Sequence, residues 1–435
     1  MISTDKFELD IIDLGANGCG VGKIDNFVYF VPFALPGEKV EVTAEKFEKH
    51  YAICKLLRVL EPSKHRIEPK CKYFGQCGGC SLQHMPSNQQ KDYLTAQLCV
   101  LLKKNNFNIL PRPCIGEAVY NYRNKVNFTI HDNSLCFAAN NSKPIKVDNC
   151  PLFSCNLAPI IAIFNDYLKN VHRNFRALHI RMLDGSYQFT FVGENFEFPE
   201  SKLLIDNLNK LSIPFSLHIS SNPIANSSNI TNATLSIYGQ EKTPYVSYGI
   251  KSHISPAAFL QVNSDIQNKI YQDIASIVPL DVHIINGYGG TGILSAILAK
   301  KAKFVYSVEI NKSASMDCEE LFKENDISNA LSICGDCKLE IPKLIRQDKN
   351  ISHIIFDPPR KGIDKNILNV IKSAQIKNII YLSCNPSSLI NDLKILSTDY
   401  EIEFIQPYNM FPHTNHVETL VYLKLKNNQS ASLKT

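Results

Sequence analysis

Apolar and polar residues alternate along the first sixty residues, between turns rich in glycine. The turns include GCGVG at 18–22 and LPGE at 35–38, and the segments FVYFVPF and EKVEVTAEKF follow the first of them. Short alternating segments of this kind are typical of strands that close a small barrel. A nucleotide-binding loop is disfavoured, because no helical pattern follows the glycines. The pattern therefore predicts an OB-like β-barrel over residues 1–60.

The central part of the chain begins with a loop rich in cysteine, glycine, proline and lysine. A helical pattern covers residues 88–105, and this helix could pack on either neighbouring domain. Further on, alternating stretches such as VNFTI, LHIRML and YQFTFVG are separated by turns rich in Asn and Ser. This alternation indicates antiparallel strands. We expect a central α+β domain over residues 61–250.

The last part of the chain has short apolar runs that alternate with helical segments. The runs are HIING, FVYSVEI, ALSIC, HIIFD, KNIIYLSC, IEFIQP and TLVYLKL. Such alternation is typical of a parallel sheet with helices on both faces, which binds ligands at the carboxyl ends of its strands. The sequence predicts a multidomain α/β protein with a Rossmann-like domain over residues 251–435.

Composition indicates the cellular compartment of the protein more clearly than its activity. The chain has 435 residues, 44% of them hydrophobic, a formal charge of +5 and fourteen cysteines. The charge suits a partner that carries phosphates but does not by itself indicate one. No signal-peptide pattern or membrane-length apolar run is found, so we expect a cytoplasmic protein with no membrane partner. In a reducing compartment the cysteines serve metal binding, catalysis or burial.

A glycine turn and two acids mark a candidate cofactor site. The turn, from Gly289 to Gly292, follows the run HIING and opens a helical segment, while Glu309 and Asp336 follow the next two strands. A backbone without side chains can approach a ligand closely, and a carboxylate at the next strand can bind ribose hydroxyls. Together they predict a nucleoside cofactor. A purely structural turn with two surface acids is the alternative.

Two further strand ends carry reactive groups. DPPRKG, which starts at Asp357, places an acid in a loop stiffened by two prolines. Cys384, in SCNP, ends the following strand, so its thiol lies at the same edge of the predicted sheet. A thiolate there could attack carbon 6 of a pyrimidine, whereas an isolated cysteine is more often a buried apolar group.

The segment FPHTNHVE contains His413, His416 and Glu418 just before the last strand. The two histidines could bind a metal, but a zinc site needs a third protein ligand that the segment does not offer. We therefore favour an acid that accepts a proton, with the histidines as hydrogen-bonding supports.

Four cysteines form the second candidate centre. They are Cys71, Cys77, Cys80 and, far downstream, Cys150. Four thiolates can bind zinc or an iron-sulfur cluster, and the number of thiolates alone does not distinguish these metals. Since a fourth cysteine is present, a structural cluster is favoured over one with an open iron, and zinc is the alternative.

Several motifs, in order along nearly the whole chain, resemble the RNA uracil-5-methyltransferase family, in the branch with a TRAM barrel and a 4Fe-4S cluster. They are GVGKIDNFVYFVPFALPGE, CKYFGQCGGCSLQH with Cys150, NYRNKVNF, SPAAFLQVN, DPPRKG, SCNP and FPHTNHVE. The resemblance implies that the four cysteines bind the cluster. It implies that S-adenosylmethionine is bound by Gln261, Tyr288, Glu309, Asp357 and, as a less certain member, Asp336.

In the same resemblance Cys384 is the nucleophile, Glu418 is the general base, and the substrate is a uridine of RNA. We expect 23S ribosomal RNA first and transfer RNA second, and a monomeric enzyme. The chain departs from the family at Asn286, where an Asp is usual, which keeps a hydrogen-bonding group but removes a charge.

Two other functions are open: methylation of a small molecule, and RNA binding with weakened catalysis. Candidate phosphate contacts are Arg123, Lys125, Arg360 and Lys361, although any one of them could be an ordinary surface charge.

Overall fold

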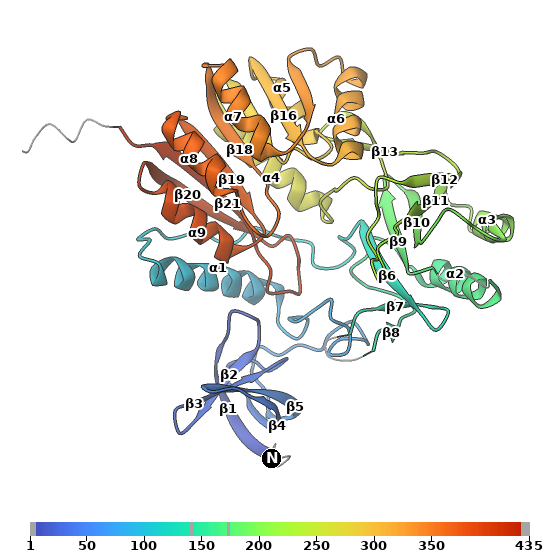
Figure 1. The fold of residues 1–435 in the computed structure, drawn as a ribbon. Helices are drawn as coiled ribbons and strands as arrows, with labels where there is room; N and C mark the ends of the chain where they lie inside the picture. The colour runs from blue at the N-terminus through green and yellow to red at the C-terminus, as the bar shows by residue number, and fades with distance from the viewer. Residues whose placement is uncertain (1–5, 140–142, 172–174, 428–435) are drawn as a thin grey trace, which may run out of the picture.

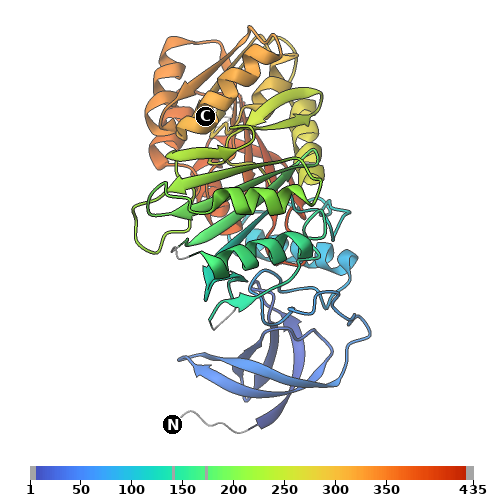
Figure 2. The ribbon, with the colours of Figure 1, turned by 90° about the vertical axis from the view of Figure 1, so that its right-hand side faces the viewer.

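The computed structural model describes residues 6–139, 143–171 and 175–427. Its three large sheets follow one another along the chain, with the first at one end of the molecule and the helix α1 (Ser87–Lys104) close above it (Figures 1 and 2). In the described residues no helix has the length and apolar character needed to cross a membrane.

The N-terminal sheet is a closed barrel, as predicted. Its strands run in the order β1-β2-β3-β5-β4. They are β1 (Lys6–Leu14), β2 (Gly20–Ile24), β3 (Phe27–Val31), β4 (Lys39–Phe47) and β5 (Tyr51–Glu61). Every second residue of β4, from Val40 to Ala44, is buried in the barrel core, which is the alternation seen in the sequence.

The central sheet has seven strands in the order β12-β11-β10-β9-β6-β7-β8. Its elements are β6 (Lys125–His131), β7 (Ser134–Phe137), β8 (Ile145–Lys146), α2 (Ala158–Asn170), β9 (Ala177–Leu183), β10 (Ser186–Gly193), α3 (Ser201–Asn209), β11 (Phe215–Ser221) and β12 (Thr234–Tyr238). Apolar residues of the sheet pack against α2 and α3. The expectation of a purely antiparallel sheet was wrong, because α3 carries the chain back so that β10 and β11 pair in parallel.

The hairpin of β13 (Thr243–Ser247) and β14 (Ile250–Ile254) leads into the C-terminal sheet, whose order is β17-β16-β15-β18-β19-β21-β20. The elements are α4 (Ser264–Ile277), β15 (His283–Gly287), α5 (Ile293–Ala299), β16 (Phe304–Glu309), α6 (Lys312–Glu324), β17 (Ala330–Cys334), α7 (Cys337–Gln347), β18 (Ile351–Phe356), α8 (Lys365–Ser373), β19 (Asn378–Ser383), α9 (Pro386–Leu396), β20 (Tyr400–Tyr408) and β21 (Glu418–Leu425). The first five strands of this order, β17, β16, β15, β18 and β19, are parallel to one another. β21 is antiparallel to both of its neighbours, β19 and β20. The predicted α/β sheet is therefore confirmed, with α7, α8 and α9 in one packed core and α4 and α5 in another.

The helix α1 joins the barrel to the C-terminal sheet. Leu98 and Leu102 belong to the same core as α7, α8 and α9, while Tyr93 and Leu94 pack with Leu14 of the barrel. Figure 1 shows α1 running beneath α9. The helix α1 therefore packs against both the barrel and the C-terminal domain.

Candidate active site

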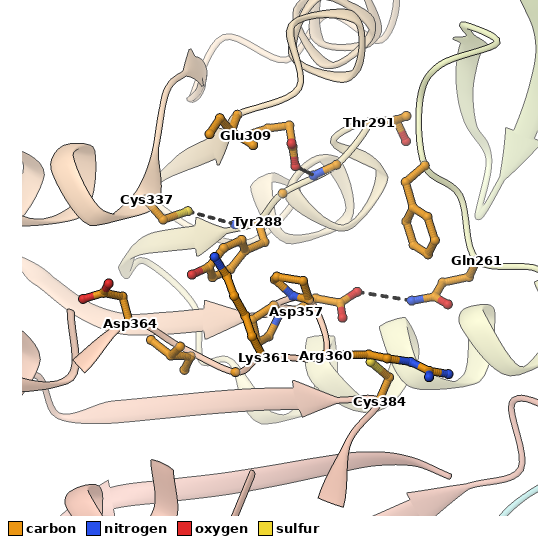
Figure 3. Close-up of a pocket in the computed structure, with 18 of the residues that line it drawn as sticks. Gln261, Tyr288, Thr291, Glu309, Cys337, Asp357, Arg360, Lys361, Asp364 and Cys384 are labelled. Atoms are coloured by element: carbon orange, nitrogen blue, oxygen red, sulfur yellow. Dashed lines mark hydrogen bonds between the residues drawn. The ribbon is translucent and has the colours of Figure 1, made fainter. Parts of the chain in front are cut away.

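The seven residues predicted for cofactor binding and catalysis line one cavity of about 870 Å³, at the edge of the C-terminal sheet where its parallel strands end. They are Gln261, Tyr288, Glu309, Asp336, Asp357, Cys384 and Glu418. Figure 3 shows the part of this cavity around Asp357 and Cys384. Parallel strands bring their carboxyl ends to one edge of the sheet, so residues more than a hundred positions apart meet there. Their individual roles remain predictions.

The glycine turn after β15 holds the Glu309 carboxylate in place. The Gly290 amide donates to Oε2 of Glu309 at 3.0 Å, and the Asn311 amide donates to Oε1 at 2.7 Å. Gly292 has φ +84°, and a Cβ added there would lie 2.3 Å from the Cys318 sulfur. A glycine is therefore required at this close approach of the turn to α6.

Tyr288 and Asp336 line the other side of the turn. The Tyr288 amide donates to the Cys337 sulfur at 3.3 Å, and Tyr288 itself has φ 60°. Asp336 caps α7 by accepting a hydrogen bond from the Lys338 amide at 2.9 Å. Because this bond uses one of its two carboxylate oxygens, the other is available to the cavity.

Asn286 points away from the cavity. Its side chain is buried and donates to the Ser295 hydroxyl of α5 at 2.9 Å, and it is not among the residues that line the pocket. The position where the family usually has an Asp thus ties the end of β15 to α5.

Asp357 and Gln261 face each other across the cavity, as Figure 3 shows. The Gln261 side-chain amide donates to Oδ2 of Asp357 at 3.3 Å. Burial raises the pKa of Asp357 to about 7, against the opposing effect of this hydrogen bond. The group can therefore exist protonated or ionised near neutral pH.

Strand pairing brings Cys384 and Glu418 together. The register of β19 and β21 ends with the pair Ser383 and Thr419, and Cys384 follows Ser383 while Glu418 precedes Thr419. The two residues thus lie next to each other at this end of the strand pair, and the charge of Glu418 raises the pKa of Cys384. The nucleophile and base inferred from the sequence are thus neighbours across two strands.

Both groups favour their neutral forms in this setting. Burial, followed by the charges of Glu418 and Asp357, raises the pKa of Cys384 to about 11. Burial and the charge of Asp357 raise the pKa of Glu418 well above its usual value. Oε1 of Glu418 is buried without a hydrogen-bond partner among the described residues. An atom of this kind is costly to leave unpaired, so it is suited to accept a partner from a ligand.

The Arg360 cation acts on both Cys384 and Glu418, which the sequence did not indicate. It lowers the pKa of both Cys384 and Glu418, and Figure 3 shows it beside Cys384. Lys361 lines the same cavity. Of the other candidate phosphate contacts, Arg123 lines the cysteine cavity described below, whereas burial and the Arg181 cation lower the pKa of Lys125 to about 7.

Sequence reasoning missed several lining residues, among them Phe259, Thr291, Cys337 and Phe411. Phe259 is 64% exposed although it is a large aromatic residue. The sequence could have indicated Phe259 through its position two residues before Gln261, because residues close to a binding residue in the chain often line the same cavity.

The two histidines differ. His413 is buried, its Nδ1 lies 3.1 Å from the side-chain nitrogen of Gln90, and its amide donates to Oε1 of Gln90 at 2.8 Å. Burial lowers its pKa to about 4, so it is a neutral hydrogen-bonding group that ties the loop before β21 to α1. Partial loss of solvent around the His416 ring, and the nearby Arg360 cation, lower the pKa of His416.

The four candidate cluster cysteines line a second cavity, of about 250 Å³. Gln83 supports it by donating to the Cys80 sulfur at 3.2 Å and accepting from the Cys71 amide at 3.2 Å. Within the described residues, no three His, Cys, Asp or Glu side chains are placed to hold a metal ion. Neither zinc nor the cluster is shown.

Comparisons with known proteins agree with this architecture. Residues 227–426 match the family model "tRNA (Uracil-5-)-methyltransferase", and residues 5–57 match the model of the TRAM domain. An uncharacterized RNA methyltransferase of Caldanaerobacter subterraneus is 32% identical over 97% of this chain and 98% of its own length. One from Clostridium acetobutylicum is 32% identical over 97% of both chains.

Among solved structures, that of Pyrococcus abyssi tRNA (uracil-54, C5)-methyltransferase in complex with S-adenosyl-L-homocysteine has a TM-score of 0.77 and 23% identity. The match covers 96% of this chain and 99% of that one, and it shows a shared fold. The sequence matches over nearly the full length establish that the chain belongs to a family of RNA methyltransferases, with a C-terminal part that matches the tRNA (uracil-5-)-methyltransferase model and an N-terminal TRAM domain.

Proposed function

We propose that the enzyme methylates carbon 5 of a uridine in RNA through a covalent bond between Cys384 and the base. The observation that carries this proposal is that the ends of β19 and β21 bring Cys384 next to Glu418 inside the large cavity. A thiol and a carboxyl on adjacent strands can act in turn on carbons 6 and 5 of one ring.

The cofactor is S-adenosylmethionine, which when bound would supply the methyl group that carbon 5 receives. The residues present fit it: Glu309 is anchored by two backbone amides beside the glycine turn, where a ribose can lie against its carboxylate. Tyr288, Asp336, Asp357 and Gln261 line the rest of this part of the cavity. The relative from Pyrococcus abyssi was crystallised with the demethylated form of the same nucleoside.

The chain's own residues perform the remaining steps. The Cys384 thiolate adds to carbon 6, and the electron pair of the 5,6 double bond makes carbon 5 nucleophilic. After carbon 5 is methylated, Glu418 accepts the proton of that carbon, the double bond forms again, and the carbon–sulfur bond breaks to release the thiolate. Arg360 favours the ionised form of both residues, because its cation lowers the pKa of each.

The RNA substrate we propose first is ribosomal, because the TRAM barrel and the cysteine run resemble the ribosomal branch of the family. Transfer RNA is the second candidate, which the name of the Pyrococcus abyssi relative favours. In either RNA the target base has to be unpaired or flipped to reach Cys384.

The four-cysteine cavity is proposed to hold a 4Fe-4S cluster. The residues fit such a group, since Cys71, Cys77, Cys80 and Cys150 line one cavity of about 250 Å³, and four thiolates are the usual ligands of a 4Fe-4S cluster. Iron and sulfide analysis of protein purified without oxygen is the direct check.

The central test uses labelled S-adenosylmethionine with separate ribosomal and transfer RNA transcripts. We expect one transcript to gain 5-methyluridine. Cys384→Ala should form no product and no protein–RNA adduct, whereas Glu418→Gln should accumulate an adduct that survives denaturation, because the thiolate cannot leave until carbon 5 loses its proton. Activity of Cys384→Ala at the wild-type level would refute the covalent route, and methylation of free uridine alone would refute an RNA substrate.

A further inference from the structure

A third cavity, of about 380 Å³, lies next to the active site and shares Arg360 and Cys384 with it. We call it the flanking cavity. Its walls come from α1, from the start of α9, from the loop before β21 and from Ala16 of the barrel. Cys384 is thus reached from two sides, with the cofactor residues on one side and the flanking cavity on the other.

Hydrogen bonds between distant segments fix the walls of the flanking cavity. The Gln97 side chain donates to the Leu14 carbonyl at 3.0 Å, and Asn415 donates to the Ala16 carbonyl at 3.3 Å. Asn385 donates to the Arg360 carbonyl at 2.8 Å, so the loop that carries Arg360 is tied to the start of α9. The cavity is therefore formed before any ligand enters.

The lining combines an apolar side with positive charge. Leu98, Val100 and Leu101 of α1 contribute the apolar side, while Lys104 and Arg360 contribute cations. Among the described residues that line it, none is an Asp or a Glu. Apolar surface favours the face of a base and cations favour a phosphate, so the lining is complementary to one nucleotide.

We propose that the flanking cavity binds the nucleotide directly adjacent to the target uridine, on its 5′ or its 3′ side. This inference rests on the proposed function, because a uracil bonded to Cys384 is connected to its neighbours by one phosphate on each side. A neighbour that leaves the stack with the target base meets the cavity at Arg360, which both sites share. Contacts to flanking nucleotides are a general means by which base-modifying enzymes select a sequence context.

The test is a double-mutant cycle between the protein and the RNA. The RNA is a synthetic hairpin cut from a transcript that the wild-type protein methylates or, where none is methylated, from one that it binds. Variants of the hairpin lack the base on the 5′ or the 3′ side of the target uridine. Val100→Trp fills the cavity from an α1 residue that is 46% exposed, so the fold is not strained.

We expect the loss of one neighbouring base to lower kcat/KM of the wild-type enzyme about 10-fold, the size of one base–side-chain contact. Val100→Trp should cost about as much on the intact hairpin and become insensitive to the missing base, since both changes remove the same contact. Ala96→Trp, also on an exposed face of α1 but outside the lining, should behave as wild type. Binding of S-adenosylmethionine should be unchanged in both variants.

The inference is overturned if the two effects multiply, if Val100→Trp equals wild type on the intact hairpin, or if neither missing base matters. The same cycle measured as RNA dissociation constants needs no turnover. Coupling in binding without methylation would contradict the proposed function and keep this inference, whereas methylation without coupling would do the reverse.

Discussion

The reactivity of Cys384 can be predicted quantitatively from its surroundings. With a pKa of about 11, roughly one thiol in a thousand is ionised at pH 8, against about one in four for free cysteine. A thiolate of higher pKa is intrinsically more nucleophilic, by roughly tenfold over this interval. The two effects together predict that Cys384 reacts with an aromatic disulfide about 20-fold more slowly than free cysteine.

Arg360→Gln is the perturbation that tests the cause. Removing the cation that lowers the pKa of Cys384 should raise this pKa, slow the reaction at pH 8 and move the rate–pH profile to higher pH. Lys361→Gln is the matched control, because Lys361 lines the same cavity but is not among the charges that set the pKa of Cys384.

The assay follows Cys384 alone, by peptide mass spectrometry of protein sampled during the reaction over a range of pH. The midpoint of the profile reports the pKa even if access of the reagent is slow. A midpoint below pH 9, or a shift of the Arg360→Gln profile to lower pH, would refute the account of this site.

Two stability predictions follow from other close contacts. Gly292→Ala should lower the free energy of unfolding by roughly 2 kcal/mol or more, because it adds backbone strain and a clash with Cys318. Gly37→Ala is the control, because Gly37 has a similar φ of +83° but no atom near the added Cβ, so it should lose only the strain contribution. Equal losses for the two variants in urea unfolding would disprove the clash. Arg66→Met should cost about 3 kcal/mol, because Glu38 is buried and hydrogen-bonded to Arg66. Burial raises the pKa of Glu38, but hydrogen bonds from Arg66 and two backbone amides outweigh burial, so the net pKa is lowered. The stability that the Glu38–Arg66 pair contributes should therefore be present above pH 5 and disappear as the pH falls through the lowered pKa. A destabilisation by Arg66→Met that persists in acid would contradict the reasoning.

The parallel strands made the cofactor side of the site predictable. Glu309, Asp357 and Cys384 each follow an apolar run, and the rule that ligands bind at carboxyl ends was enough to bring them together. The parallel pairing of β10 with β11 was not predictable, since short alternating runs do not reveal which neighbour a strand will choose.

The partnership of Cys384 with Glu418 depends on sheet order, which the sequence pattern alone does not reveal. β21 is the last strand in the chain but lies between β19 and β20, and only this insertion sets Glu418 next to Cys384. The flanking cavity was still further from prediction. It joins residues from Ala16 to Val417, and no local pattern marks any of them as members of one site.

The position of Glu418 also depends on the barrel. The segment just before Glu418 is held by two hydrogen bonds. The His413 amide donates to the Gln90 side chain of α1, and the Asn415 side chain donates to the Ala16 carbonyl. α1 is in turn bonded to the barrel, since the Tyr93 hydroxyl donates to the Gly15 carbonyl at 2.7 Å. Since each link joins backbone to a side chain of another segment, a rotation of the barrel would shift the loop on which β21 begins. The TRAM barrel is therefore part of the framework that holds Glu418 next to Cys384.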